Sequence, residues 1–395
     1  MRLLMVFSDN PYPARANGIS VRYAPIIEML GTRHTIDVAM LARPTETQFP
    51  EGLDAICNTV RVLNRRQVVP ALPIRIANRL LKCVSRGVPY PLDCYDRDDI
   101  EHFLRQLDES AHYDLIVWVG SLHLEIGLAV FGGERIAHDA IDSLYHAFIR
   151  AKSQSPFAAI DAQRIRDWEK QLIACTKCTT FVSQTDAALY SSDPALQGKV
   201  KVVPNGIYLG DFDVRPPAPR NGAAITLGFL GHMGYAPNIA AVLRLAEILK
   251  KVRAIDADYR LLVIGRAPAP EIQALADSDS IVVTGTVDNI WDYIAAVDAF
   301  VFPMVSGAGQ QNKLLEAMYG GKLVISNSLA NSGIGATHGQ HLLLCESDEE
   351  FVTAILALRT AHERMSDIAT DGKSFVSEKF EWNRIIPTLE ALWTA

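Results

Sequence analysis

The stretch AFVFPMVSGAGQQNKLLEAM, residues 299–318, decides the fold. It begins with a short apolar run that ends at Phe302, passes through a loop of small residues, and continues with Leu314 and Met318 at helical spacing. A continuous apolar run of this length predicts a strand buried on both faces, and strand–loop–helix units build parallel sheets. We therefore predict an α/β protein.

The same alternation extends over the whole chain. Further apolar runs predict strands at residues 3–7, 35–41, 115–119, 180–183, 200–203, 226–230, 259–264, 281–284, 323–326 and 342–344. The Pro- and Gly-rich stretch VRPPAPRNG, residues 214–222, separates two series of strands and cannot continue either sheet. We predict two Rossmann-like domains, residues 1–210 and 222–380, with a last helix at about 380–395 whose packing partner the periodicity does not assign.

Composition excludes several classes of protein. Of the 395 residues 49% are hydrophobic and 21% charged, which excludes wholesale disorder, and a net charge of −7 argues against a nucleic-acid binder. No run of about 20 apolar residues exists to span a bilayer, and the first apolar run is too short for a signal peptide. The sequence predicts a cytoplasmic protein.

Cysteine spacing gives no sign of a metal site. The six cysteines are scattered, and only Cys175 and Cys178 form a CxxC pair, without a second ligand pair nearby. We expect these two residues to be small apolar members of a helix, and we expect no metal.

One segment is strongly basic. Residues 55–92 contain no acidic residue and seven basic ones, so the rest of the chain has a formal charge of −14. Arg75, Arg79, Lys82 and Arg86 share one face of a helical pattern. Two interpretations stay open for segment 61–86: a solvated helix face, or an interfacial helix on an anionic membrane, where each basic residue contributes about 1 kcal/mol.

The loop after Phe302 has the features of an anion site. Its small residues let the backbone approach a ligand, and the helix that follows begins with free N–H groups. Lys313 lies in the first helical turn, where a cation is electrostatically unfavourable unless a phosphate compensates it. Glu316, one turn further on, can accept hydrogen bonds from a pair of sugar hydroxyls. The alternative is an ordinary loop with a solvated lysine.

These residues resemble a known family. GAGQQNKLLEAMYGGKLVIS (307–326) resembles the donor-site signature of GT-B glycosyltransferases of the retaining family four, particularly bacterial exopolysaccharide sugar transferases. Matching elements continue through both halves of the chain. They are VVPNGI (202–207), LGFLGHMGYAPNIAAV (227–242), VIGRAPAPEIQALA (263–276), VTGTVDNIWDYIAAVDAFVFP (283–303) and, more loosely, NPYPARANGISVRYAPIIEML (10–30) and HDAIDSLY (138–145).

The resemblance implies a GT-B architecture, in which two Rossmann-like domains face a cleft, and a nucleoside diphosphate sugar as donor. Lys313 is then expected at the diphosphate and Glu316 at the ribose hydroxyls. The full set of expected donor-binding residues is Gly18, Arg266, Gly309, Gln310, Gln311, Asn312, Lys313 and Glu316.

Two departures from the family pattern concern the donor. The family's first glutamate, eight residues before the second, is replaced here by Ala308, which puts the choice of donor sugar in doubt. The first turn of the second domain, residues 231–238, lacks the Arg or Lys that many relatives place on the diphosphate. Arg266 either compensates for this loss or is a surface arginine.

The first domain contributes the acceptor side. His138 and Asp139 follow a short apolar run, residues 135–137, and we expect His138 at the strand end beside the donor sugar or the acceptor. Asp139 and Asp142 are alternatives for holding acceptor hydroxyls, and His123 is the competing histidine. The expected catalytic set is His138, Lys313 and Glu316, with no named nucleophile.

The predicted function is a retaining hexosyltransferase that moves a sugar to a glycan or lipid-linked glycan in exopolysaccharide or cell-surface polysaccharide synthesis. Its expected partners are a nucleotide sugar, the acceptor and an anionic membrane surface on the inner face of the cell membrane, and not nucleic acid. Two alternatives stay open: a nucleotide-sugar epimerase of GT-B fold, or a non-catalytic binding protein.

Overall fold

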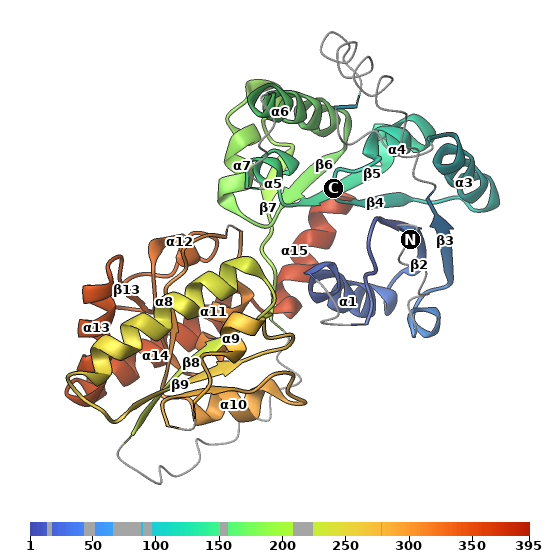
Figure 1. Cartoon of the computed structure of the whole chain (residues 1–395). Coiled ribbons are helices and arrows are strands. Elements are labelled where there is room, and N and C mark those ends of the chain that lie inside the picture. Colours follow the sequence, from blue (N-terminus) through green and yellow to red (C-terminus); the bar gives the residue numbers. More distant parts are fainter. Residues whose placement is uncertain are drawn as a thin grey trace. The chain divides into compact units, whose positions relative to one another are not determined.

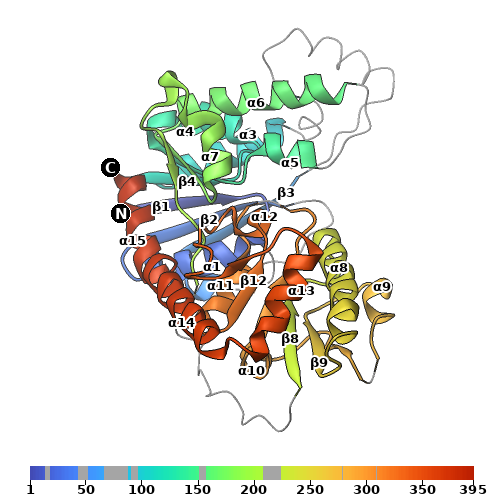
Figure 2. The same ribbon diagram turned by 90° about the vertical axis from the view of Figure 1, so that its left-hand side faces the viewer.

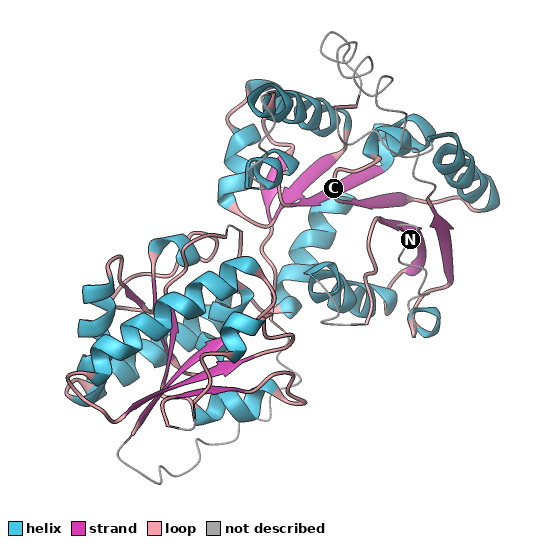
Figure 3. Cartoon of the chain, viewed as in Figure 1, coloured by secondary structure: helices cyan, strands magenta, loops and turns pink. Residues whose placement is uncertain are grey.

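The computed structural model describes residues 1–13, 18–42, 52–65, 88–89, 97–150, 157–207, 224–277, 279–307 and 309–395. It shows an α/β protein built on two parallel sheets (Figures 1 and 3). The chain divides into two compact units. Unit 1 consists of Met1–Pro204 and Trp382–Ala395, and unit 2 of Asn205–Glu381.

Unit 1 contains a seven-stranded sheet in the order β3-β2-β1-β4-β5-β6-β7, with every pair parallel. Its strands are β1 (Arg2–Phe7), β2 (Thr35–Ala42), β3 (Thr59–Asn64), β4 (Leu115–Val119), β5 (Ile136–Ile141), β6 (Cys178–Phe181) and β7 (Val200–Val202). Its helices are α1 (Gly18–Gly31), α3 (Arg97–Ser110), α4 (Leu124–Phe131), α5 (Leu144–Arg150), α6 (Ala158–Cys175), α7 (Gln184–Ser191) and α15 (Trp382–Thr394).

Alternate residues of β1 contribute to two hydrophobic clusters, one on each face of the sheet of unit 1. Leu3, Met5 and Phe7 pack with helices α1 and α15, whereas Leu4 and Val6 pack with α3, α4 and α6. Figure 2 shows α1 and α15 on one side of this sheet and α3, α4 and α6 on the other. The strand is buried on both faces, which is why its sequence is continuously apolar.

Unit 2 contains a six-stranded parallel sheet in the order β10-β9-β8-β11-β12-β13. Its strands are β8 (Ile225–Leu230), β9 (Tyr259–Ile264), β10 (Ile281–Val283), β11 (Ala299–Phe302), β12 (Leu323–Ser326) and β13 (Leu343–Leu344). Its helices are α8 (Ala236–Arg253), α9 (Pro270–Gln273), α10 (Ile290–Ala296), α11 (Asn312–Tyr319), α12 (Ser328–Asn331), α13 (Asp348–Leu356) and α14 (His362–Lys379). Short 3-10 turns occur in both units: η1 (Leu53–Ala55), η2 (Gly133–Arg135) and η3 (Pro194–Leu196) in unit 1, and η4 (Ala357–Arg359) in unit 2.

Both sheets reverse their strand order once, between β1 and β4 in unit 1 and between β8 and β11 in unit 2. Open parallel sheets bind ligands at the carboxyl ends of the strands that flank such a switch point. The loops after β8 and β11 are therefore the first place to look for a site in unit 2.

The last helix of the chain belongs to unit 1. Trp382, Ile386, Leu389 and Trp393 of α15 are buried in the same core as β1, β2, β4 and α1. The polypeptide therefore passes between the units twice. Near both crossings, and within unit 2, the Ile207 amide donates to the Phe380 carbonyl at 2.6 Å.

Several expectations from the sequence differ from the structure. The edge strand β3 (Thr59–Asn64) was not expected, because its alternating residues do not form an apolar run. Strand β5 does not end at residue 137 but continues to Ile141. The expectation that Cys175 and Cys178 share a helix is wrong, because Cys175 ends α6 and Cys178 begins β6.

Two predicted segments lie outside the described residues. They are the linker at 214–222 and most of the basic segment 61–86, of which only residues 61–65 are described. Within the described residues, every helix is too short or too polar to cross a bilayer.

The core position of α15 predicts a large loss of stability on truncation. We expect Trp393→Ala to lower the free energy of unfolding by about 3–5 kcal/mol, because its buried ring leaves a cavity. Thr388→Ala, on the exposed face of the same helix, should change it by less than about 0.5 kcal/mol. Equal effects of the two substitutions in denaturant titrations would show that α15 does not contribute to the core.

Candidate active site

Two glycine turns bring the loops after β8 and β9 into backbone contact. Gly231 and Gly265 have φ of +152° and +150°, a region that side chains rarely adopt. A Cβ on Gly265 would lie 1.7 Å from the Gly231 carbonyl oxygen. The Met233 amide also donates to the Arg266 carbonyl at 2.9 Å. Only glycines allow this approach, and it fixes the entrance to helix α8.

Asn238, in the first turn of α8, is buried and has both ends of its side chain occupied. Its Nδ2 donates to the His232 carbonyl at 3.0 Å, and its Oδ1 accepts from Lys313 Nζ at 2.6 Å. The carbonyl acceptor sets the orientation of the amide, because the NH₂ group must face it. Asn238 therefore presents a neutral oxygen, and not a charge, to the lysine.

Lys313, the second residue of α11, is only 7% exposed. Its ammonium lies 3.2 Å from Met304 Sδ and over the rings of Phe229 and Phe302, at 4.9 Å and 5.7 Å from their centroids. Among the described residues, no carboxylate forms an ion pair with it. Burial lowers the pKa of this amine to about 7.

The surroundings of Lys313 favour a negatively charged ligand. Helices α8 and α11 both begin beside the ammonium, and the positive end of a helix dipole repels a cation but attracts an anion. Aromatic faces and a neutral amide only partly replace the lost hydration. A phosphate group would restore the missing charge balance and would also accept N–H donors from the first turn of α11.

The loop before α11 is held from two sides. The Gln310 side chain accepts from the Asn205 amide at 2.7 Å and donates to the Asn205 carbonyl at 2.8 Å. A Cβ on Gly333 would lie 2.6 Å from the Gly309 carbonyl oxygen, so the loop rests directly on backbone. Gly309 itself has φ +80°. Both ends of the Gln310 amide are thus used within the protein, and a contact of this loop with the donor stays a prediction for its backbone.

Helix α11 brings three of the predicted residues together. Asn312 and Glu316 are four residues apart and share a face of the helix, with Lys313 beside them. Asn312 Oδ1 is buried and has no hydrogen-bond partner among the described residues. Gln311 immediately precedes the helix, and Ala308 lies outside the described residues. The arrangement offers a cation, an amide and a carboxylate within one helical turn.

Arg266 and Gly18 occupy more peripheral positions. Arg266 is exposed in the turn after β9. Its carbonyl accepts the amide of Met233, which lies in the turn after β8. Gly18 is the exposed first residue of α1 in unit 1, and a Cβ there would meet no atom within 4 Å. Their roles toward the donor stay predictions.

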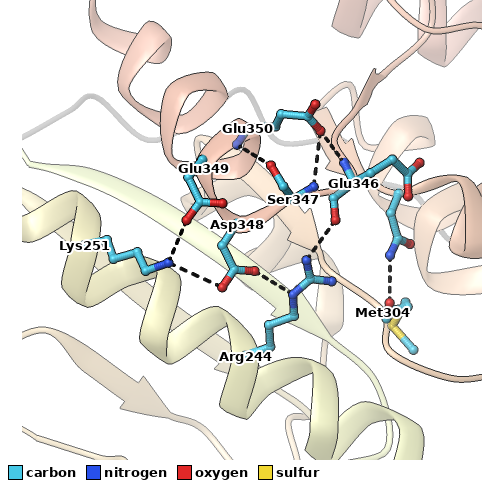
Figure 4. A network of polar contacts seen from close by, with 9 residues as sticks. Arg244, Lys251, Met304, Glu346, Ser347, Asp348, Glu349 and Glu350 are labelled. Carbon is cyan, nitrogen blue, oxygen red and sulfur yellow. Dashed lines mark hydrogen bonds and ion pairs between the residues drawn. The ribbon is translucent and has the colours of Figure 1, made fainter.

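A polar network holds helix α8 and the Met304 loop in place (Figure 4). Arg244 of α8 donates to Asp348 at the start of α13 at 2.8 Å, and Lys251 lies 3.6 Å from the same carboxylate. Asn327 Nδ2 donates to the Met304 carbonyl at 2.7 Å. These contacts hold in place the helix that carries Asn238 and the loop that carries Met304, two of the groups that meet the Lys313 ammonium.

In unit 1 the structure places His138 differently from the sequence prediction. Because β5 continues to Ile141, His138 lies inside the strand and not at its end, and it is fully buried. Its Nδ1 lies 3.2 Å from Thr179 Oγ1 and its Nε2 3.4 Å from Ser121 Oγ. Burial lowers its pKa to about 4, so the imidazole is neutral. A catalytic role for it stays a prediction.

Asp139 is also buried, in a network of protein donors. Its carboxylate accepts from Arg22 at 2.7 Å, from the Tyr23 hydroxyl at 2.6 Å and from Thr180 at 3.0 Å. Desolvation raises the pKa of Tyr23 well above its usual value, which keeps this hydroxyl a donor. Asp142, by contrast, is exposed just beyond the carboxyl end of β5.

The competing histidine, His123, is buried as well. Its Nε2 lies 2.7 Å from an Arg65 nitrogen, and burial together with that guanidinium lowers its pKa to about 3. Sequence reasoning missed Asn238, although Pro237, which favours the first turn of a helix, could have indicated that a helix begins there.

Comparisons with known proteins find similarity to glycosyltransferases. Residues 224–360 match the family "Glycosyl transferases group 1". An uncharacterized 44.6 kDa protein of the Klebsiella pneumoniae cps region is 26% identical over 145 residues, which cover 37% of this chain and 33% of that protein. The alignment thus spans about a third of that relative.

Two solved structures share the whole fold. Sucrose-phosphate synthase of Thermosynechococcus elongatus has a TM-score of 0.70 at 16% identity and covers 100% of this chain and 98% of its own. Anabaena Alr3699/HepE in complex with UDP-glucose has a TM-score of 0.62 at 14% identity and covers 98% and 99%. The chain has the GT-B fold, and residues 224–360 of its second unit match glycosyl transferases group 1. The fold predicted from the sequence is confirmed, and the match of residues 224–360 agrees with the predicted resemblance to glycosyltransferases. Membership of the retaining family four stays a prediction.

Because the described residues give the buried Lys313 ammonium no carboxylate partner, we predict that this site reduces the stability of the fold. The folded-state pKa of Lys313 lies below its unfolded value of 10.5, so the unfolded chain binds this proton more tightly and stability falls as the pH drops from 10.5 toward 7. We expect Lys313→Met to raise the free energy of unfolding at pH 7 by about 1–4 kcal/mol.

The size of this gain should shrink as the pH approaches 10. Denaturant titrations at pH 7 and pH 10 measure it, and Lys250→Met, at an exposed position of α8, is the control. A Lys313→Met protein that is less stable than the parent at pH 7 contradicts the electrostatic description.

Proposed function

We propose that this protein is a retaining hexosyltransferase, which moves a sugar from a nucleoside diphosphate sugar to a glycan or lipid-linked glycan. The observation that carries the proposal is Lys313, a buried cation at the beginning of two helices, which has no carboxylate partner among the described residues. It lies in the part of the chain that matches glycosyl transferases group 1. A diphosphate has the charge that this position lacks.

The residues around Lys313 account for the chemistry of sugar transfer. As the bond between the anomeric carbon and the donor phosphate breaks, negative charge builds up on the departing diphosphate. A fixed ammonium and the N–H groups of the first turn of α11 stabilise that charge better in the transition state than in the ground state. Glu316 would accept hydrogen bonds from the ribose hydroxyls. We name no nucleophile, and retention rests on the family resemblance.

The comparisons support a nucleoside diphosphate sugar as the donor and polysaccharide synthesis as the pathway. Anabaena Alr3699/HepE has been crystallised with UDP-glucose, which makes UDP-glucose the first donor to test. The Klebsiella relative is encoded in a cps region, which supports a role in exopolysaccharide or cell-surface polysaccharide synthesis. We further propose a cytoplasmic protein that is peripheral on the inner membrane face through segment 61–86, and a reaction that needs no metal.

The proposal is tested by following nucleotide sugars with and without glycan acceptors. UDP-glucose and other nucleoside diphosphate hexoses should bind, and turnover should require the acceptor. Conversion of the donor without any acceptor would indicate the epimerase, and failure of every nucleotide to bind would indicate a non-catalytic protein. NMR of the first-formed product determines whether the anomeric configuration is retained.

Substitutions should separate binding from folding. We expect Lys313→Met to lower kcat/KM by at least about a hundredfold, the effect of removing one transition-state charge contact, while the variant stays folded. Lys250→Met is the matched control, since Lys250 is an exposed lysine paired with Glu247. Turnover near that of the parent in Lys313→Met contradicts the site.

Donor binding should also take up a proton above pH 7. A bound diphosphate raises the pKa of Lys313 from about 7, so only the protonated amine binds well and the affinity falls by up to about tenfold per pH unit above 7. Below pH 7 the affinity should stay flat. Calorimetric titration of UDP-glucose in two buffers of different ionisation enthalpy measures the proton.

A control variant distinguishes Lys313 from other groups that could take up the proton. Asn238→Asp places a carboxylate on the ammonium, so it should abolish the proton uptake and weaken UDP-glucose binding. Undiminished proton uptake in Asn238→Asp assigns the effect to another group and contradicts the prediction.

A further inference from the structure

Unit 1 contains an Asp–His pair that the sequence analysis did not identify. His146 is the third residue of α5, which follows β5, and Asp186 is the third residue of α7, which follows β6. Strands β5 and β6 are parallel neighbours, so the two helices begin at the same edge of the sheet. His146 Nδ1 lies 2.6 Å from Asp186 Oδ1.

Asp186 fixes the tautomer of His146. The Asp186 side chain is only 2% exposed, and its second oxygen accepts the Ser183 hydroxyl at 2.7 Å. Because both carboxylate oxygens act as acceptors, Nδ1 of the imidazole must carry the hydrogen that faces Asp186. In the neutral ring this leaves Nε2 as an acceptor.

The free nitrogen of His146 is available to a ligand. The imidazole is 24% exposed, in contrast with the fully buried His138. Within the part of the chain that the structure describes, Nε2 has no hydrogen-bond partner. The buried Asp186 carboxylate thus orients the half-buried imidazole through Nδ1. The other nitrogen, Nε2, can then accept a hydrogen bond from a ligand hydroxyl.

The neighbouring side chains suit a sugar. The Tyr145 ring lies 5.6 Å from the His146 ring and has the Arg166 guanidinium at 5.8 Å. Ile149, one turn further along the same face of α5, is 47% exposed. The buried Glu169 carboxylate is occupied, since it accepts from the Leu144 amide at 3.0 Å. Aromatic and apolar surface beside an oriented hydrogen-bond acceptor provides both kinds of contact that a glycan needs.

We propose that His146, oriented by Asp186, binds a hydroxyl group of the acceptor glycan through Nε2. This inference rests on the proposed function, because it assumes that the sheet edge of unit 1 holds an acceptor. His146 is then an acceptor-binding residue, and Asp186 is a positioning residue that acts through it. The ligand class is a hexopyranoside, either a free glycan or the glycan end of a lipid-linked one.

The test follows His146 directly by NMR of protein with ¹⁵N-labelled histidine. The resonance missing in His146→Gln assigns the residue, and titration with methyl β-D-glucopyranoside and hexyl β-D-glucopyranoside, with the corresponding galactosides and mannosides, should shift its Nε2 signal. The exposed His102 of α3 is the control and should not move. Stronger binding of the hexyl glycoside, reduced by Ile149→Ser, would identify a lipid-linked acceptor, and equal binding a free glycan.

The variants must separate binding from structure. We expect His146→Gln to weaken glycoside binding at least threefold, the effect of one lost hydrogen bond, with an unchanged melting temperature and an unchanged thermal shift with UDP-glucose. Asp186→Asn should increase the other tautomer, seen in the two ring nitrogen shifts, and weaken glycoside binding similarly. Once the acceptor is known, both variants should raise its KM more than they lower kcat.

Two results overturn the proposal. One is an Nε2 signal that none of the glycosides moves, and the other is a His146→Gln protein with parental affinity for them. Failure of the proposed function would look different, because the glycosides would still shift His146 while no nucleotide sugar bound to unit 2.

Discussion

The burial of one positive charge governs the chemistry of the candidate site in unit 2. An ammonium taken out of water requires either a carboxylate or an incoming anion, and the described residues around Lys313 supply only an amide oxygen, a sulfur atom and two ring faces. An aspartate in place of Asn238 would satisfy the charge permanently and leave nothing for a ligand to neutralise. The neutral partner is therefore what makes this position a binding site.

An uncompensated charge is useful only if its surroundings cannot relax. The glycine turns at Gly231 and Gly265 leave no room for side chains, and Arg244 ties α8 to the start of α13. Gln310 fastens the loop before α11 to the backbone of Asn205. These contacts hold both helices around the buried ammonium, so a bound anion meets a preorganised site.

The sequence predicted those features that arise from local periodicity. Apolar runs located the strands of both sheets except β3, and the strand–loop–helix pattern placed Lys313 at the start of α11, because each signal lies within a few neighbouring residues. Asn238 was missed because its partner is 75 residues away. The Asp–His pair of α5 and α7 depends on the adjacency of β5 and β6, which the linear sequence does not display.

His138 shows why a polar residue after an apolar run is an ambiguous signal. The strand continues through His138 and Asp139 because partners from distant elements satisfy them: Arg22 and Tyr23 of α1 reach the carboxylate across more than 100 residues of sequence. A buried polar pair inside a strand and a catalytic pair at its end have the same local sequence. Only the long-range partners distinguish them, and none of these follows from periodicity.

The same long-range contacts tie both units to the connection between them. Arg22, paired with Asp139, also donates to the carbonyls of Val203 and Pro204, the last residues of unit 1 before the crossing. Asn205, the next residue, is held by Gln310 of the loop before α11. The chain on each side of the crossing is therefore a rigid part of its own unit. Because the Asn205 backbone and the loop beside Lys313 share two hydrogen bonds, a ligand that repositions this loop must either move the first residue of unit 2 with it or break that pairing.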